Sequence, residues 1–361
     1  MQNSCRHNSS GFIKIIRLLS CFCLYFLTLK VGLSSTFEAY ANVILQVRKG
    51  VYNGLFTNFF YEPLFMGILG VYSLFFKYAS FFNLYLSDFS QRFIPAIIFG
   101  AILVCCCIWA TRRLGKNMLF FHSIMVLDST LCSLPWHLTR TYVAVILTIA
   151  VTQKCLLECK SIKKWRLGSI IPPLAHWSFW TLPLLQLTTS IRIGSFLRKK
   201  FILFFSLAAT CFFFVAPLVT QKLVGESIQI QDYFVFSRIF EFLSGQKLGE
   251  LSFLICFLGM TYFVLLNCKN EPWYPVLKWM AIIYALAFLG LSNEPILNRL
   301  KCLFWPLYLY LFCFYNNQNR NSKACLFKWA FFLYFAALAC FHQASGSYKN
   351  RIPFFSWGLD I

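Results

Sequence analysis

The stretch PPLAHWSFWTLPLLQL, residues 172–187, is apolar enough for a lipid bilayer, yet it carries His176, Ser178 and three prolines. Basic clusters flank it on both sides, KKWR at 163–166 and RKK at 198–200, and such flanks mark the cytoplasmic face of a membrane. Proline interrupts helices. We therefore expect two short half-helices that turn back at His176 beside a polar recess, since broken backbone at membrane depth must line protein or a cavity. One span of reversed orientation is the alternative.

The composition of the whole chain agrees with a membrane setting. Of its 361 residues, 59% are hydrophobic and 12% are charged, whereas soluble proteins have about 25% charged residues. The apolar residues come in long runs without strand-like alternation, which disfavours a β-barrel. The sequence therefore predicts an all-α, polytopic helical bundle with broken or re-entrant helices around an outward-facing polar cavity.

The chain is expected to form a single domain, residues 1–361, with roughly nine to eleven membrane segments. An interfacial helix is expected at 63–82. The arm 118–127 is too short to span, and a polar turn at 127–141 follows it. Segments 34–62, 221–248 and 293–299 are expected outside, and spans are expected at about 12–33 (an uncleaved first span), 93–112, 201–220, 249–267, 276–292, 300–316 and 325–342.

The formal net charge of +21 comes from 33 Lys and Arg against 12 Asp and Glu. Cytoplasmic loops account for most of this excess, so nucleic acid is not expected as a partner. Several arginines fall on the expected outer face, where an anionic lipid or a phosphate suits them. The 16 cysteines lie mostly in apolar runs and lack zinc-site spacing, so neither a metal nor a cofactor is expected.

Ionisable residues at membrane depth are costly and mark candidate sites. In this chain they gather in the expected outer half, and the set is Asp128, His137, Arg140, His176, Ser178, Glu294, Asn298 and Arg299. Several cations and two histidines around one recess suit an anion site with a proton acceptor. Simpler interpretations stay open: snorkelling for Arg140 or Arg299, a satisfied buried imidazole for His176, and an Asp128–Arg140 ion pair.

Two stretches carry a family resemblance, STLCSLPWHLTRTYVAVILTIAV (129–151) and LGSIIPPLAHWSFWTLPLL (167–185). Together they resemble the EpsG-like branch of Wzy-type polysaccharide polymerases. That family has the form S-x-x-x-R-Q-x-(I/L)-A and then A-x-x-x-H-x-S, which Arg140, His176 and Ser178 match. The chain departs from this pattern at Thr141, Pro173 and Ala175.

Two further stretches extend the resemblance over most of the chain. YEPLFMGILGVYS (61–73) is similar to the family's E-P-(L/G)-(F/Y) segment, so Glu62 is the matching carboxylate. NRLKCLFWPLYLYLF (298–312) resembles the start of a late helix and matches Arg299.

The resemblance implies a glycosyltransferase of the bacterial cytoplasmic (inner) membrane that joins undecaprenyl-pyrophosphate-linked repeat units into O-antigen, capsule or exopolysaccharide. Arg140 and Arg299 would then hold the pyrophosphate, and His176 would be the base or would position the acceptor. Glu62, Asp128 and Glu294 are rival bases. The lipid-linked glycan and the bilayer would be partners, together with a chain-length regulator and a flippase. The alternatives are another lipid-linked glycosyltransferase, an O-antigen ligase or a repeat-unit flippase.

Overall fold

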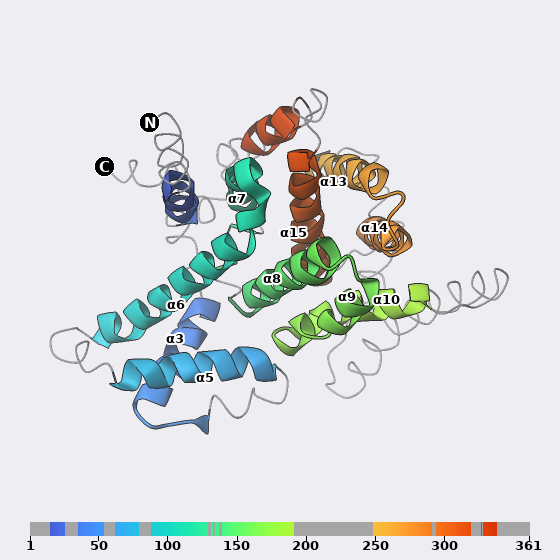
Figure 1. Cartoon of the computed structure of the whole chain (residues 1–361). Helices are drawn as coiled ribbons and strands as arrows, with labels where there is room; N and C mark the ends of the chain where they lie inside the picture. Colours follow the sequence, from blue (N-terminus) through green and yellow to red (C-terminus); the bar gives the residue numbers. More distant parts are fainter. Residues whose placement is uncertain are drawn as a thin grey trace, which may run out of the picture.

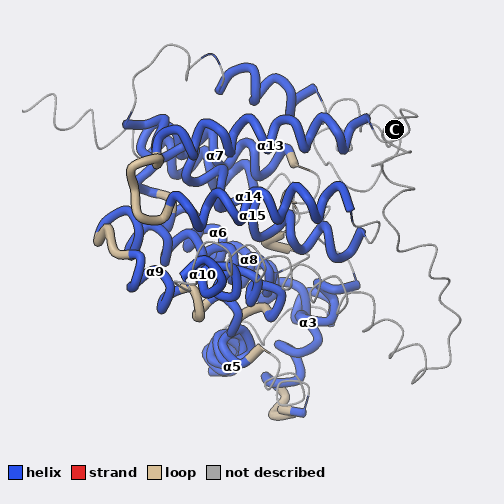
Figure 2. The backbone as a smooth tube through the Cα atoms, turned by 90° about the vertical axis from the view of Figure 1, so that its right-hand side faces the viewer, coloured by secondary structure: helices blue, strands red, loops and turns tan. Residues whose placement is uncertain are grey.

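The structure is a computed structural model. It describes residues 15–25, 35–53, 62–78, 88–128, 131–132, 134–136, 139–190, 248–290, 294–318, 326 and 328–337. Within these ranges the chain forms only helices and connecting turns, as Figure 2 shows. The expected all-α class is confirmed for this part of the chain. The expected span 201–220 and almost all of the expected loop 221–248 lie outside the described residues.

Two of the described helices are long and apolar enough, by length and composition, to cross a membrane. The first candidate span, Phe93–Ala110, lies in helix α6 (Asp88–Ala110) and agrees with the expected span 93–112. The second joins α8 (Thr139–Val151) to the π-helical turn η3 (Thr152–Glu158). Shorter apolar helices lie at Ile15–Tyr25, Pro63–Phe75, Ser252–Asn267 and Tyr274–Phe288.

The expected short arm is helix α7 (Met118–Leu127), which follows the 3-10 helix η2 (Arg112–Asn117). A helix of 10 residues is about 15 Å long, which is half the hydrocarbon thickness of a bilayer. Gly115 has a φ of +56°, which a residue with a side chain rarely adopts, and this produces the kink between α6 and α7.

The turn between α7 and α8 is fixed against α6 by one close approach. Trp136 is fully buried, and its indole N–H donates to the Tyr25 carbonyl at 3.3 Å. A Cβ atom on Gly100 would lie 2.5 Å from the Trp136 ring, so only glycine lets this ring pack against α6. The turn therefore holds the first residues of α8 in place.

Helix α15 (Glu294–Gln318) corrects one boundary of the sequence analysis. We expected an outer loop at 293–299 and a helix from 300, but the helix begins at Glu294. Pro295 fits this start, because proline is tolerated in the first helical turn, where its missing N–H has no intrahelical partner. Glu294, Asn298 and Arg299 therefore lie on a helix, while their side chains lie outside the described set.

Helix α15 packs between α8 and α13 (Leu248–Asn267), and it also contacts α14 (Tyr274–Gly290) and α7 (Figure 1). Aromatic side chains fill these contacts. The Trp305 and Phe253 rings are 4.9 Å apart, and the Tyr308 and Phe257 rings are 5.3 Å apart, both with edge-to-face geometry. Such pairs stabilise a helix contact beyond the apolar area that they bury.

On the other side of α6, α3 (Ser35–Arg48) packs on α6 and on α5 (Pro63–Tyr78) (Figure 1). The segment 34–62 is thus not a plain loop, because α3 is helical. Helix α5 forms within the expected interfacial segment 63–82. The Tyr40 and Phe65 rings are 5.4 Å apart and join α3 to α5.

The segment around His176 is broken, as expected. It consists of α9 (Ile162–Gly168), two short 3-10 helices, η4 (Pro172–Leu174) and η5 (Trp177–Trp180), and α10 (Thr181–Ser190). The chain turns back within it, since α9 contacts α10 and the Ser169 hydroxyl donates to Gln186 Oε1 at 2.8 Å. The break and the turning back of the chain are therefore confirmed, which argues against the alternative of one continuous span.

Candidate functional site

An ion pair joins the two best matched charged residues of the sequence analysis. Arg140 is the second residue of α8, and Glu62 immediately precedes α5. The Nη1 of Arg140 donates to both Glu62 carboxylate oxygens, at 3.3 Å and 3.2 Å. The Glu62 side chain is 3% exposed and the Arg140 side chain is 39% exposed. The alternative of an Asp128–Arg140 ion pair is therefore wrong, since Arg140 pairs with Glu62.

The exposed part of Arg140 is available to a ligand. Its Nη2 and Nε atoms have no hydrogen-bond partner among the described residues. Guanidinium presents its N–H groups in a planar fork that matches phosphate oxygens, and it stays charged at all physiological pH values. Glu62 thus holds one end of the guanidinium, while the other end has no partner among the described residues.

Tyr40 of α3 lies beside this pair, close enough to feel the charges of both Arg140 and Glu62. Burial raises the pKa of the Tyr40 phenol to about 12, Arg140 opposes the shift, and Glu62 adds to it. The hydroxyl therefore stays protonated at neutral pH and is a hydrogen-bond donor beside the Arg140–Glu62 pair. The sequence analysis missed Tyr40, because its approach to Glu62 depends on the packing of α3 on α5.

His176 is buried, and its side chain caps the 3-10 helix η5. Its Nδ1 accepts from the Ser178 backbone N–H at 3.2 Å, and the Ser178 hydroxyl lies 2.9 Å from the same atom. A backbone amide can only donate, so Nδ1 carries the lone pair. In the neutral ring the proton is therefore on Nε2.

This tautomer decides what His176 can do. Nδ1 already accepts hydrogen bonds and Nε2 carries the proton, so the neutral ring has no free lone pair with which to remove a proton. This argues against His176 as the base, and its positioning role stays a prediction. The alternative of a satisfied buried imidazole also agrees with the hydrogen bonds at Nδ1. Ser178 contributes by donating its backbone N–H to this atom.

Asp128 forms a second buried ion pair. Its Oδ2 lies 2.8 Å from the Lys301 Nζ, and the two side chains are 2% and 15% exposed. Oδ1 accepts from the Leu131 backbone N–H at 3.1 Å. The Lys301 ammonium also lies 4.3 Å from the centre of the Phe253 ring. Asp128 is therefore engaged in joining α7, α13 and α15, which argues against it as a rival base.

The elements that carry these residues contact one another. Helices α5 and α8 both contact η4, which precedes His176, and α15 contacts both α8 and η5. Glu62, Arg140 and His176 thus lie on neighbouring elements. His137 lies outside the described residues, and so do the side chains of Glu294, Asn298 and Arg299.

Two polar residues were missed in the apolar runs. Lys301 is charged and stands at the start of the expected span 300–316, a signal that could have singled it out. His122 is fully buried between the Tyr25 hydroxyl, 3.0 Å from Nδ1, and Thr111 Oγ1, 2.8 Å from Nε2. Both ring nitrogens are hydrogen-bonded, so His122 stabilises the contact between its neighbours.

The described residues hold no group of three or more His, Cys, Asp or Glu side chains placed to bind a metal ion. No protein-family profile, curated protein or solved structure matches this chain.

Proposed function

We propose that the chain is a multi-pass enzyme of the bacterial cytoplasmic membrane that joins polyprenyl-diphosphate-linked oligosaccharide repeat units into a polysaccharide. The observation that carries the proposal is the Arg140–Glu62 pair, in which a buried carboxylate holds a half-exposed guanidinium. The pair lies on elements next to the broken segment at His176. The family resemblance of the same residues supports the proposal.

The charge distribution along the second candidate span indicates which of its ends faces outward. Arg140 lies near one end of Thr139–Glu158, and the other end runs into Lys160, Lys163 and Lys164. Basic loops stay on the cytoplasmic side, so the Arg140 end faces outward. The apolar runs in the rest of the chain supply the further spans of a polytopic bundle.

The leaving group explains the choice of an arginine. The transfer breaks the bond between the sugar C1 and the diphosphate oxygen, and negative charge develops on that oxygen. Fixed donors aimed at a developing charge are the largest single source of catalysis in many enzymes. The Nη2 and Nε groups of Arg140 suit this role, because Glu62 fixes the orientation of the guanidinium through Nη1.

Glu62 is the base in this proposal. When the diphosphate engages Nη2 and Nε of Arg140, one Glu62 oxygen keeps its hydrogen bond to Nη1 and the other oxygen is released. It then accepts the proton of the acceptor hydroxyl as the hydroxyl oxygen bonds to C1, and the polyprenyl diphosphate leaves with the electron pair. His176 orients the acceptor or the phosphate, and Arg299, which lies early on α15, is a second candidate phosphate ligand.

The test is a gel of surface glycan from a host that lacks this gene and makes the cognate repeat unit. The wild-type gene should restore a ladder of chain lengths, and the deletion should show a single-repeat band. Arg140→Lys keeps a positive charge beside Glu62 but removes the planar fork. We expect it to lower polymer yield about 100-fold, as the loss of one transition-state donor does.

Arg113→Lys is the matched control, because Arg113 is an exposed arginine that also pairs with a glutamate. It should leave the ladder unchanged at equal protein level. A full ladder with Arg140→Lys would refute the assigned role of Arg140. Loss of all surface glycan with repeat units trapped inside the deleted host would indicate a flippase, and free polymer that is not joined to its final acceptor would indicate a ligase.

A further inference from the structure

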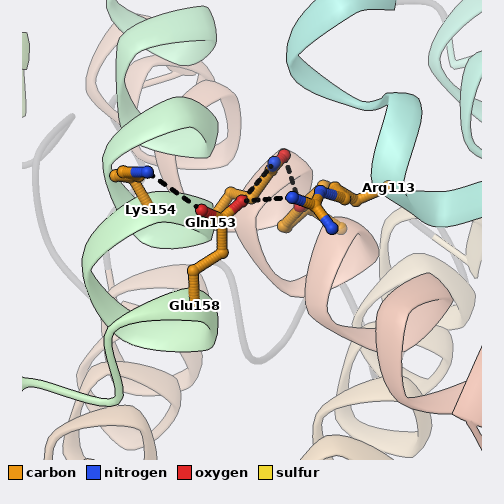
Figure 3. Close-up of polar contacts among 5 residues, drawn as sticks. Arg113, Gln153, Lys154 and Glu158 are labelled. Atoms are coloured by element: carbon orange, nitrogen blue, oxygen red, sulfur yellow. Dashed lines mark hydrogen bonds and ion pairs between the residues drawn. The ribbon is translucent and has the colours of Figure 1, made fainter.

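The end of α8–η3 opposite Arg140 has a charge cluster of its own. Glu158 accepts from Gln153 Nε2 at 3.1 Å and from Lys154 Nζ at 3.2 Å, and one oxygen lies 3.5 Å from Arg113 Nη2 (Figure 3). The π-helical turn brings residues five apart onto one face, so Gln153 can reach Glu158. Two cations, Arg113 and Lys154, thus use the same carboxylate.

Further cations at this end are exposed and have no ion-pair partner among the described residues. They belong to η2 and to the segment that leads into and forms α9, and they are Arg112, Lys116, Lys160, Lys163 and Lys164. Glu158 already pairs with Arg113 and Lys154, so its charge does not neutralise the other cations of this end. We call η2, η3 and α9 together the basic end.

The parts of the basic end are fixed to one another. The Arg113–Glu158 contact joins η2 to η3. The Trp165 indole N–H donates to Thr152 Oγ1 at 3.2 Å and joins α9 to η3. The ring of Trp165 is fully buried, so Lys163 and Lys164, its exposed neighbours on α9, are held on a rigid surface.

Exposed apolar side chains lie among these cations. Trp109 is 63% exposed, and the Arg112 guanidinium stacks on its ring at 3.9 Å. Leu167, Ile170 and Ile171 are also exposed and follow the lysines of α9. A nucleic acid or an acidic soluble protein would match the cations but not the apolar side chains, whereas a phospholipid matches both.

We propose that the basic end binds the phosphate headgroups of anionic phospholipids, in the leaflet opposite the Arg140 site. Lys163 and Lys164 bind the phosphate, and Trp109 and Leu167 contact the acyl chains. The inference rests on the membrane setting of the proposed function and not on its chemistry.

The test uses the full chain purified in detergent and titrated with fluorescent phosphatidylglycerol in mixed micelles. Phosphatidylglycerol should bind and phosphatidylcholine should not. We expect Lys163→Gln with Lys164→Gln to weaken phosphatidylglycerol binding about 25-fold, since each basic residue near an anionic lipid surface contributes about fivefold. Both side chains are exposed, and the Ser161 cap uses the Lys164 backbone N–H, so the variant should fold.

Lys49→Gln is the control, because Lys49 is an exposed lysine in the segment 34–62, which we expect on the opposite face, and its loss should leave binding unchanged. Equal weakening by this control, equal binding of phosphatidylcholine, or displacement of the lipid by millimolar inorganic phosphate would overturn the proposal. The glycan ladder is read separately in cells. If the wild-type chain makes a normal ladder but does not bind phosphatidylglycerol, the lipid proposal has failed. If it binds phosphatidylglycerol but makes no ladder, the proposed function has failed.

Discussion

Two arginine–glutamate pairs lie near opposite ends of the same candidate span. Arg140 and Glu62 are 3.2 Å apart, and Arg113 and Glu158 are 3.5 Å apart. Their surroundings differ: the Glu62 side chain is 3% exposed, and the Glu158 side chain is 27% exposed. The same two chemical groups thus form a buried pair near one end and a solvated pair at the other.

This difference shows why only one pair is a candidate site. Water screens the Glu158 carboxylate, so its pair adds little and any solvent ion can replace it. The Glu62 carboxylate has given up its water and depends on Arg140 for compensation. A ligand that binds Arg140 therefore weakens its ion pair with Glu62, which is the coupling that the proposed mechanism uses.

The largest expected effect is at the other buried pair, Asp128–Lys301. Lys301→Met should lower the free energy of unfolding by about 3–5 kcal/mol, because it leaves the buried Asp128 charge without compensation. The free energy is measured by denaturant titration of the purified protein in mixed micelles. Adding Asp128→Asn should recover most of the loss. A single variant as stable as wild type would mean that Asp128 is solvated, as Glu158 is.

A smaller loss of stability is expected at Gly100, where helix α6 packs against the turn before α8. Gly100→Ala should lower the free energy of unfolding by about 1–3 kcal/mol, because the added methyl overlaps the Trp136 ring. Gly67→Ala on α5 is the control, since a Cβ there meets nothing within 4 Å. That control should be neutral or slightly stabilising. Equal effects of both variants would show that the turn is loosely packed.

The smallest effects compare the two glutamates directly. Glu62→Gln should lower the free energy of unfolding by about 1 kcal/mol, because the amide still accepts a hydrogen bond from Arg140 but lacks the charge. Glu158→Gln should leave the unfolding midpoint unchanged at both low and high salt. A salt-dependent loss with Glu158→Gln, or none with Glu62→Gln, would reverse the assignment of the buried and the solvated pair.

Much of the fold could be predicted from local patterns. Long apolar runs predicted α6, α13 and α14 close to their observed bounds, and the prolines at 172–183 predicted the break at His176. The boundary of α15 was harder to predict. The low hydropathy of segment 293–299 predicts a loop, although Pro295 is compatible with a helix start.

The site was predicted only in part, because local patterns do not specify contacts between residues that are distant in the sequence. Sequence reasoning selected Glu62, Asp128, Arg140 and His176, because charged or ionisable residues in apolar chain are costly. It did not predict which of these side chains pair with one another, or that Asp128 pairs with Lys301. Glu62 and Arg140 are 78 residues apart, and nothing local to either residue names the other.

The sequence by itself determined the helical class, the turning back at His176 and the residue types available for an anion site, because these follow from apolar length, proline positions and side-chain chemistry. Only the tertiary structure decided that Arg140 pairs with Glu62, that Lys301 pairs with Asp128, and that the His176 ring is oriented by Ser178. The two ion pairs depend on which helix ends meet. The ring orientation depends on the backbone conformation of a broken segment, which composition does not specify.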